Sequence, residues 1–325
     1  MRPAGGMPRR KQRITAAQTK ELRKKERQKV GRLRHQVVAK RTEDRYHTAF
    51  QSFCRFHGLD TSFGLPAHDE FDDMASDYIE YLWESGEPKS AANYVLAALQ
   101  YFRPQCKKHL PWAWKLVKVW NQVELPLRAT PSSPELMMAF AGQATSYREY
   151  TFAHLVVVGF ALFLRTGELL ALSGADVTMG RSSAVIFIPS SKGAKRKFLP
   201  VERLELTEAS ALRSLRYFLK EHPRNTPFWA KSRNEFMVIW RQIVGDLRLD
   251  DFHFRPYSLR RGGATSAFKA GVSLDRLLEL GRWQHASTAR IYLDSGLQAL
   301  TSLALPRPAQ KLISSAVDVF LALSQ

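Results

Sequence analysis

The sequence predicts a mainly α-helical protein of two domains, with a small antiparallel β-sheet in the second domain. The chain has 325 residues, whereas a typical domain has about 150. Apolar residues recur at helical spacing through most of the chain, and a proline-rich segment separates two such stretches. With 45% hydrophobic residues, the chain can also bury a sizeable core.

The N-terminal segment, residues 1–36, is strongly basic. Residues 1–41 carry fifteen Lys or Arg against Glu21 and Glu26, which places +13 of the formal net charge of +19 in this stretch. Because like charges repel, such an arm does not condense on itself and attracts polyanions in a salt-dependent way. We expect the arm to be disordered or to contact DNA; a solubilising tail and a nuclear-targeting signal are compatible alternatives.

Residues 37–125 are predicted to form a compact helical domain. Apolar and aromatic residues recur at helical spacing from about residue 37, and Gly58 follows the first helix as a stop signal. Further helices are predicted over residues 69–84, 90–102 and 112–123. We expect the aromatic residues of this domain to form its core.

The second domain, residues 135–300, follows a predicted linker. Residues 126–134 contain three prolines and little apolar content, which is typical of a linker. The helices expected after it cover residues 135–144, 148–166, 208–221, 234–247, 259–270, 274–280 and 287–293. Two short strands are predicted at 184–188 and 197–201, joined by a polar, cationic turn that is typical of a β-hairpin.

The last segment, residues 301–325, is predicted to be a C-terminal tail that contains a helix. From Leu312 to Leu323 its apolar residues share one helical face. Such a helix could dock on a neighbouring subunit or fold back on its own, and the sequence favours neither.

Several classes of protein are disfavoured by composition. Cys54 and Cys106 are too few for a metal site of their own or a disulfide framework, so a reducing compartment is expected. The longest apolar run, Phe152 to Leu164, has thirteen residues, whereas a membrane-spanning helix needs about 20. The basic N-terminus has no apolar stretch behind it, so no secretory signal is expected.

Residues suited to phosphoryl transfer on DNA recur in the second domain. Such a transfer needs a nucleophile, cations for the phosphate oxygens and a proton for the leaving oxygen. A tyrosine can form a phosphoester, an arginine binds phosphate with its planar fork, and a lysine can donate the proton. Four such residues are Arg165, Lys192, Arg260 and Tyr292.

The order of the motifs resembles that of the tyrosine recombinase (phage integrase) family. The motifs are Phe163-Leu-Arg-Thr-Gly-Glu168, Ser191-Lys-Gly-Ala-Lys-Arg-Lys-Phe-Leu-Pro-Val201, Tyr257-Ser-Leu-Arg-Arg-Gly-Gly-Ala-Thr265, Leu280-Gly-Arg-Trp283 and Ile291-Tyr292. The resemblance covers about residues 135–300 as the catalytic domain. It also implies that the preceding helical unit is a core-binding domain, which clamps DNA.

The resemblance implies a role for each matching position. Arg165 and Arg260 match the two catalytic arginines, and Glu168 matches the acidic neighbour that helps to orient the first. Lys192 matches the hairpin lysine that acts as general acid. Trp283 matches the position that the family fills with His or Trp to donate a hydrogen bond to the phosphate.

Tyr292 matches the nucleophile, which would form a 3′-phosphotyrosyl link and release a 5′-hydroxyl. Tyr257 departs from the pattern, because the family usually has a histidine at this position. A neutral phenol can donate a hydrogen bond, but it does not exchange a proton near pH 7 as imidazole does. His253 does not fit this position, and His285 could approach the site, although a surface role is expected for it.

The resemblance implies a site-specific DNA recombinase or integrase that acts on double-stranded DNA as a homo-tetramer, with a dimer at each site. No metal or other cofactor and no membrane partner are expected. Two alternatives remain, a catalytically weakened or inactive domesticated DNA-binding protein and an enzyme that resembles type IB topoisomerases. The expected location is the nucleus in a eukaryote and otherwise the cytoplasm or nucleoid.

Overall fold

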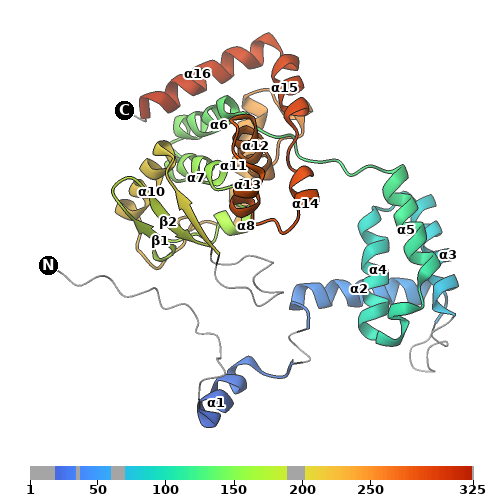
Figure 1. Ribbon diagram of the computed structural model, residues 1–325. Helices are drawn as coiled ribbons and strands as arrows, with labels where there is room; N and C mark the ends of the chain where they lie inside the picture. The colour runs from blue at the N-terminus through green and yellow to red at the C-terminus, as the bar shows by residue number, and fades with distance from the viewer. Residues whose placement is uncertain (1–18, 34–36, 60–69, 189–201, 324–325) are drawn as a thin grey trace. The chain divides into compact units, whose positions relative to one another are not determined.

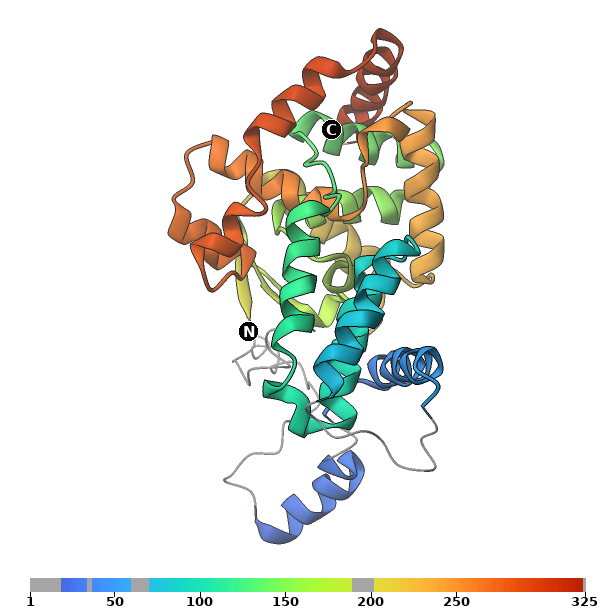
Figure 2. The ribbon, with the colours of Figure 1, turned by 90° about the vertical axis from the view of Figure 1, so that its right-hand side faces the viewer.

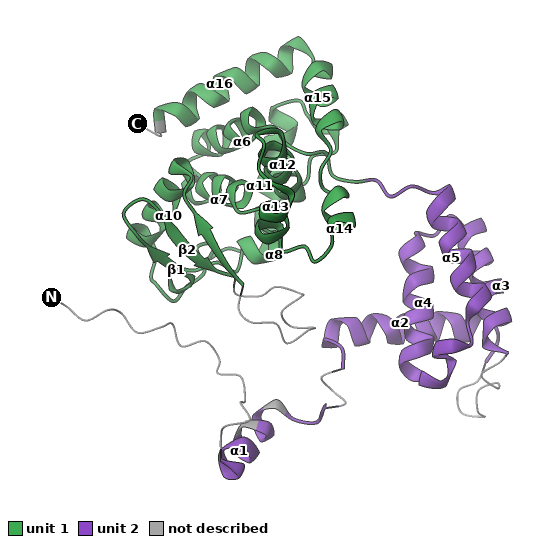
Figure 3. Cartoon of the chain, in the orientation of Figure 1, with its two compact units in different colours: residues 1–8, 128–325 green, residues 9–127 purple. Residues whose placement is uncertain are grey.

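The computed structural model describes residues 19–33, 37–59, 70–188 and 202–323 of the chain. It divides into two compact units (Figure 3), one of residues 9–127 and the other of residues 1–8 and 128–325. Within the described ranges, no helix is long and apolar enough to cross a membrane.

The smaller unit is entirely helical in its described part (Figure 1). Its helices are α1 (Lys20–Val30), α2 (Lys40–Phe56), α3 (Phe71–Glu84), α4 (Lys89–Phe102), the 3-10 helix η2 (Pro104–Lys108) and α5 (Pro111–Val123). The apolar faces of α2, α3, α4 and α5 meet in one core that includes Phe53, Phe71, Ile79, Leu96 and Leu99, all 2% exposed or less. Phe53 and Phe71 lie in the core as expected for the aromatic residues of this domain, whereas others are exposed, namely Phe56, Tyr81, Trp83, Trp112 and Trp114.

A buried carboxylate joins α3 to α5. Asp72 accepts hydrogen bonds from the backbone nitrogens of Trp112 and Ala113, each at 3.0 Å. These N–H groups lie in the first turn of α5, where no intrahelical partner exists, and Pro111 precedes them. Asp72 therefore caps a helix that begins about forty residues further along the chain.

The larger unit is mainly helical with one small sheet. Its helices are α6 (Pro134–Ser146), α7 (Tyr150–Ala161), α8 (Thr166–Leu169), η3 (Gly174–Asp176), α10 (Ala209–Glu221), α11 (Arg233–Asp246), η4 (Asp250–Phe252), α12 (Tyr257–Lys269), α13 (Leu274–Gly281), α14 (Ala286–Arg290), α15 (Ser295–Ala304) and α16 (Arg307–Leu323). Helices α6, α8, α10 and α12 pack against α7, which is apolar on nearly all sides and lies in the core. The predicted fold class is confirmed.

The sheet has three antiparallel strands in the order β1-β2-β3. They are β1 (Val177–Met179), β2 (Ala184–Phe187) and β3 (Arg203–Leu206). β2 lies where the first strand was predicted, and Ala184 pairs with Leu206 of β3. The second predicted strand, 197–201, lies outside the described residues. β1 and β3 were not predicted, because three or four residues of alternating burial are a weak signal.

One predicted helix is wrong in its extent. Residues 148–166 were expected to form a single helix, but α7 ends at Ala161 and α8 begins at Thr166. Between them Phe163 has φ of 47°, in the left-handed region that interrupts a helix. This break allows Arg165 to leave the helix axis and precede α8 as its N-cap.

The proline-rich segment is bound to the larger unit along part of its length. The backbone nitrogen and the hydroxyl of Thr130 donate to the carbonyls of His253 and Phe252, respectively. Ser132 bonds to the carbonyl of Ser258 through both its backbone nitrogen and its hydroxyl. The part of the predicted linker from residue 129 onward is thus packed, because its polar groups find partners on the following domain.

The C-terminal helix α16 lies along α6 of its own chain (Figures 1 and 2). Ile313, Ala316 and Phe320 are buried in the core of the larger unit. A Cβ atom on Gly142 of α6 would lie 1.7 Å from the carbonyl oxygen of Ala316. The two helices therefore approach closely, and of the two alternatives for this helix the structure has the one in which it folds back.

A buried histidine makes the larger unit sensitive to acid. His154 on α7 lies 3.0 Å from the hydroxyl of Ser214 and stacks on Tyr217. Burial lowers the pKa of His154 to about 4, whereas an imidazole in the unfolded chain has a pKa of about 6.5. The unfolded chain therefore takes up this proton first, so stability is full above pH 6.5 and decreases as the pH falls toward 4.

We expect the His154→Phe variant to lose much of the pH dependence of unfolding between pH 7 and pH 5. Urea denaturation at a series of pH values measures this slope. If the variant kept the full wild-type slope, a titratable group other than His154 would be responsible for the pH dependence of unfolding.

Candidate active site

The predicted nucleophile, Tyr292, lies in the turn that follows α14. Its carbonyl accepts a hydrogen bond from the Thr265 hydroxyl at 3.2 Å, and that hydroxyl accepts one from the backbone nitrogen of Asp294 at 3.3 Å. Arg261 donates to the carbonyl of Ile291 and pairs with Asp294, both at 3.4 Å. Two residues of α12 thus hold the turn that carries Tyr292.

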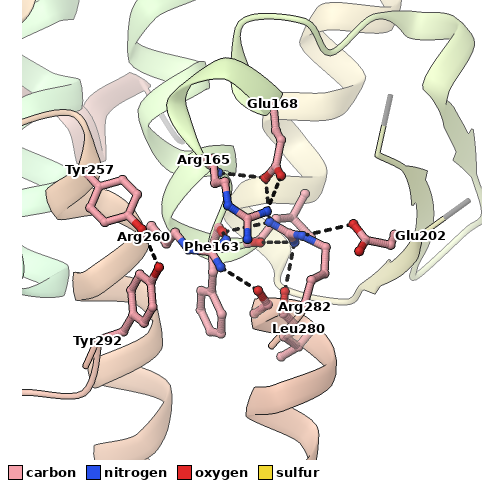
Figure 4. Close-up of polar contacts among 11 residues, drawn as sticks. Phe163, Arg165, Glu168, Glu202, Tyr257, Arg260, Leu280, Arg282 and Tyr292 are labelled. Atoms are coloured by element: carbon pink, nitrogen blue, oxygen red, sulfur yellow. Dashed lines mark hydrogen bonds and ion pairs between the residues drawn. The ribbon is translucent and has the colours of Figure 1, made fainter. Parts of the chain in front are cut away.

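The phenols of Tyr257 and Tyr292 are hydrogen-bonded at 2.7 Å, with Tyr257 as donor (Figure 4). Burial raises the pKa of Tyr257, as does its bond to Tyr292, so it stays protonated. Burial alone would also raise the pKa of Tyr292, but the hydrogen bond from Tyr257 and the charges of Arg260 and Arg165 lower it overall. The pair therefore favours the phenolate on Tyr292.

Arg260 lies beneath these rings and is completely buried. Its terminal nitrogens donate to the carbonyls of Phe163 and Gly281, and its guanidinium carbon lies 5.1 Å from the centre of the Tyr292 ring. Burial, reinforced by the charges of Arg282 and Arg165, lowers the pKa of Arg260 to about 10, so it remains cationic at pH 7. Among the described residues its Nε has no hydrogen-bond partner.

Arg165 is more open, with 30% of its side chain exposed. It contacts Glu168 twice, because its guanidinium lies 2.6 Å from one carboxylate oxygen and its backbone nitrogen 2.9 Å from the other. Burial alone would lower the pKa of Arg165, but the Glu168 carboxylate raises it overall. Glu168 therefore holds Arg165 in place and keeps it charged.

Trp283 closes the other side of the Tyr292 ring. The centres of the two rings are 4.7 Å apart, and Trp283 is 6% exposed. Its indole N–H lies near enough to lower the pKa of Tyr292, yet it makes no hydrogen bond of ordinary geometry within the described part of the chain. A Cβ atom on Gly281 would lie 2.1 Å from the Trp283 ring, so only glycine fits there.

A surface hollow of about 530 Å³ opens beside this cluster. Arg165, Trp283, Tyr292 and His285 are among the residues that line it. His285 is exposed there, so it reaches the rim of the hollow as well as the surface. Lys192, the remaining predicted site residue, lies outside the described residues.

Sequence reasoning missed three residues of the site. Arg261, Thr265 and Arg282 stand within the quoted motifs and contact the segments that carry the predicted residues, but the resemblance assigns none of them a role. Arg261 and Thr265 stand four residues apart on the helix that begins at Tyr257, a spacing that places them on one face. Nothing in the sequence distinguishes Arg282 from an exposed arginine.

Solved structures of DNA strand-exchange enzymes share this fold. The integrase of transposon Tn1549, in complex with transposon right end DNA, has a TM-score of 0.59 at 13% identity, covering 83% of this chain and 95% of that chain. The XerH site-specific recombinase bound to its difH substrate has a TM-score of 0.52 at 16% identity, covering 72% of this chain and 70% of that chain. At these identities the likeness concerns the fold.

Sequence comparison identifies the family. An integrase/recombinase, a XerD homolog of Selenomonas ruminantium, is 28% identical over 163 residues. The match covers 44% of this chain and 46% of that relative, so it spans about half the length of either. The family model of the phage integrase family matches residues 130–298, more than half of the chain. The chain therefore belongs to the phage integrase family, the tyrosine recombinases.

Proposed function

We propose that this protein is a site-specific DNA recombinase or integrase that cleaves and rejoins DNA through a 3′-phosphotyrosyl intermediate. The observation that carries the proposal is the Tyr292 hydroxyl, which accepts a hydrogen bond from Tyr257 at 2.7 Å beside Arg260 and Arg165. A phenol with a lowered pKa at the edge of an open hollow is suited to attack a phosphodiester.

In the proposed step, the Tyr292 oxygen attacks the scissile phosphorus. A bond forms between phosphorus and the phenolic oxygen, and the bond to the 5′-oxygen breaks. The Tyr292 proton leaves through the hollow, because Tyr257 is already protonated and cannot accept it. The departing 5′-oxygen needs a proton, and the resemblance assigns its delivery to Lys192.

Cations around Tyr292 would stabilise the charge that develops on the phosphate. Arg165 faces the hollow and is the more open of the two predicted catalytic arginines, since Arg260 is completely buried. The Nε of Arg260 and the indole N–H of Trp283 are buried, and neither has a hydrogen-bond partner among the described residues. Such groups cost about 1–3 kcal/mol each when unsatisfied, and phosphate oxygens would satisfy them.

Double-stranded DNA is the proposed substrate. The Tn1549 and XerH structures named above are complexes with DNA, and this chain carries a net charge of +19 with most of it near the N-terminus. We assign DNA binding to the helical unit of residues 37–125 and to the basic arm. The proposed working form is a homo-tetramer on two DNA sites, in the nucleus of a eukaryote or the nucleoid of a bacterium.

A nicked suicide substrate tests the proposal. Cleavage next to the nick releases a short fragment, so rejoining fails and the protein stays attached to DNA. We expect a complex that resists denaturant, with the DNA linked to the peptide that contains Tyr292. A library of half-sites would report the preferred sequence in the same experiment. DNA binding without any such complex would contradict the proposal.

A second candidate function is a DNA-binding protein that has lost turnover. Two observations favour it. Tyr257 occupies the position where the family usually has histidine, and both terminal nitrogens of Arg260 are bonded to carbonyls. The suicide substrate separates the two functions, because this protein would bind DNA without forming the covalent complex.

The Tyr257→Phe variant is expected to cleave more slowly at neutral pH and to need a higher pH for its maximal rate. Without the Tyr257 hydrogen bond the pKa of Tyr292 rises, so less phenolate is present at a given pH. Cleavage rates on the suicide substrate between pH 6 and pH 10 measure the shift. The Tyr257→His variant is the control and should restore the rate at neutral pH. An unchanged profile in Tyr257→Phe would argue against this role.

A further inference from the structure

The side chain of Arg282 is buried at the centre of the site, although the resemblance assigns this member of the Leu280-Gly-Arg-Trp283 motif no role. It ends α13 in the left-handed conformation, with φ of 55°. Only 3% of its side chain is exposed, and its guanidinium points into the protein among backbone carbonyls and carboxylates (Figure 4). A cation in this position is costly unless its hydrogen bonds are satisfied.

The guanidinium of Arg282 joins three separate segments. One terminal nitrogen donates to the carbonyl of Leu280, two residues earlier in the chain, at 2.9 Å. The other donates to the carbonyl of Phe163, in the turn between α7 and α8, at 3.1 Å and to Glu168 of α8 at 2.7 Å. Its Nε forms an ion pair with Glu202, at the start of β3, at 3.6 Å.

Glu168 is placed between two arginines. The Glu168 side chain is 2% exposed, with Arg282 at 2.7 Å and Arg165 at 2.6 Å. Burial alone would raise the pKa of Glu168, but Arg282 and then Arg165 lower it overall. Arg282 and Arg165 together keep Glu168 ionised, with the charge of Arg282 as the largest single cause, and the ionised carboxylate holds Arg165.

We infer that Arg282 is a positioning residue for strand cleavage. It fixes the position of Glu168, and through it that of Arg165, relative to Trp283 and β3. This inference rests on the proposed function, because it concerns the same site. Arg282 borders the hollow, but its guanidinium would not touch DNA itself, since only 3% of the side chain is exposed. It would act by keeping three segments in one arrangement, so that Arg165 and Tyr292 reach the same phosphate.

The fork of arginine is needed for this task. Its five N–H groups lie in one plane, so it can contact two carbonyls and two carboxylates at once. A lysine ammonium has three N–H groups on a single atom. Lysine at this position would thus retain the charge beside Glu168 and lose part of the carbonyl contacts.

The Arg282→Met variant tests the inference on the suicide substrate. We expect covalent complex formation to slow by about 10- to 100-fold, as when catalytic groups are misplaced by about 1 Å. DNA affinity should stay within about threefold, because the side chain is buried. Arg276→Met is the matched control, because Arg276 lies on the same helix and forms an exposed ion pair with Glu279. It should cleave at the wild-type rate.

The pH profile separates positioning from a general loss of structure. The charged groups that face Glu168 are Arg165 in its own turn, Arg260 from α12 and Arg282, with Glu202 beyond the last. Removal of Arg282 raises the pKa of Glu168, so the acid limb of the cleavage profile should move to higher pH. Adding Glu168→Gln to Arg282→Met should cause little further loss, because both changes break the same contact.

The Arg282→Lys variant decides the question if Arg282→Met does not fold. Its acid limb should stay near that of the wild type, while its rate falls by about tenfold or more. Wild-type rates and profiles in the folded Arg282 variants would overturn the inference and leave the proposed function intact. Absence of the covalent complex in the wild-type protein would instead contradict the proposed function.

Discussion

The Tyr292→Phe variant is expected to form no covalent complex with DNA. Loss of the phenolic oxygen removes the only atom that the proposed step joins to phosphorus, and removal of a nucleophile costs about 10⁴-fold or more in other enzymes. The phenyl ring keeps its contacts with Trp283 and Arg260, so the fold and DNA binding should be retained. Denaturing gels of suicide-substrate reactions measure the complex, and mobility shifts measure binding.

A mixture of two inactive variants extends this test. Tyr292 contacts Tyr257 and Trp283 of its own chain, so each subunit should supply its own nucleophile. Mixing Tyr292→Phe with Arg165→Ala should therefore restore no cleavage, because neither kind of subunit holds both the tyrosine and the arginine. Recovery of the covalent complex would show that the tyrosine is delivered to a neighbour. A covalent complex in Tyr292→Phe alone would refute the assignment of the nucleophile.

The Gly142→Ala variant is expected to lose the packing of α16. The added methyl group would lie 1.7 Å from the carbonyl oxygen and 2.7 Å from the carbonyl carbon of Ala316. These are backbone atoms of a helix, so α16 must move as a whole. Overpacking of this kind costs roughly 1–3 kcal/mol, which corresponds to a decrease in Tm of roughly 2–12 °C for a unit of this size.

Gly296→Ala is the matched control for this change. Gly296 also lies in a helix of the larger unit, and nothing lies within 4 Å of its added Cβ. It should be neutral or slightly stabilising, because alanine favours a helix by up to about 1 kcal/mol over glycine. Limited proteolysis should then cleave near residues 305–325 in Gly142→Ala and spare the control. Equal Tm values for the two variants would mean that α16 is not held against α6.

Most helices could be predicted from the sequence, whereas the geometry of the site could not. Helices such as α3 and α11 bury one side over several turns, so their periodicity is long enough to detect. The break at Phe163 was missed, because its left-handed conformation depends on carbonyl contacts with Arg260 and Arg282 from distant segments. Helix α15 was missed as well, since four of its five apolar side chains are exposed.

The family pattern supplied the order of the site residues and left their contacts undetermined. Tyr257 could be recognised as a departure from the usual histidine, but the pattern does not say that its hydroxyl meets that of Tyr292. Arg282 forms its contacts only after α13, the turn before α8 and β3 have come together. Such contacts join residues more than a hundred positions apart, for which a single sequence has no periodic signal.

Residues 129–132 pack against segments that the ribosome synthesises much later. Arg261 donates to the carbonyl of Ala129, and Gln298 donates to that of Ser132 at 2.8 Å, across 166 positions of the chain. A ribosome adds about 5–20 residues per second, so Ser132 waits roughly 10–30 s for this partner. The nascent chain therefore carries all of residues 37–125, to which we assign DNA binding, well before the proposed cleavage site can assemble. Premature termination anywhere before residue 292 would yield a protein without the proposed nucleophile.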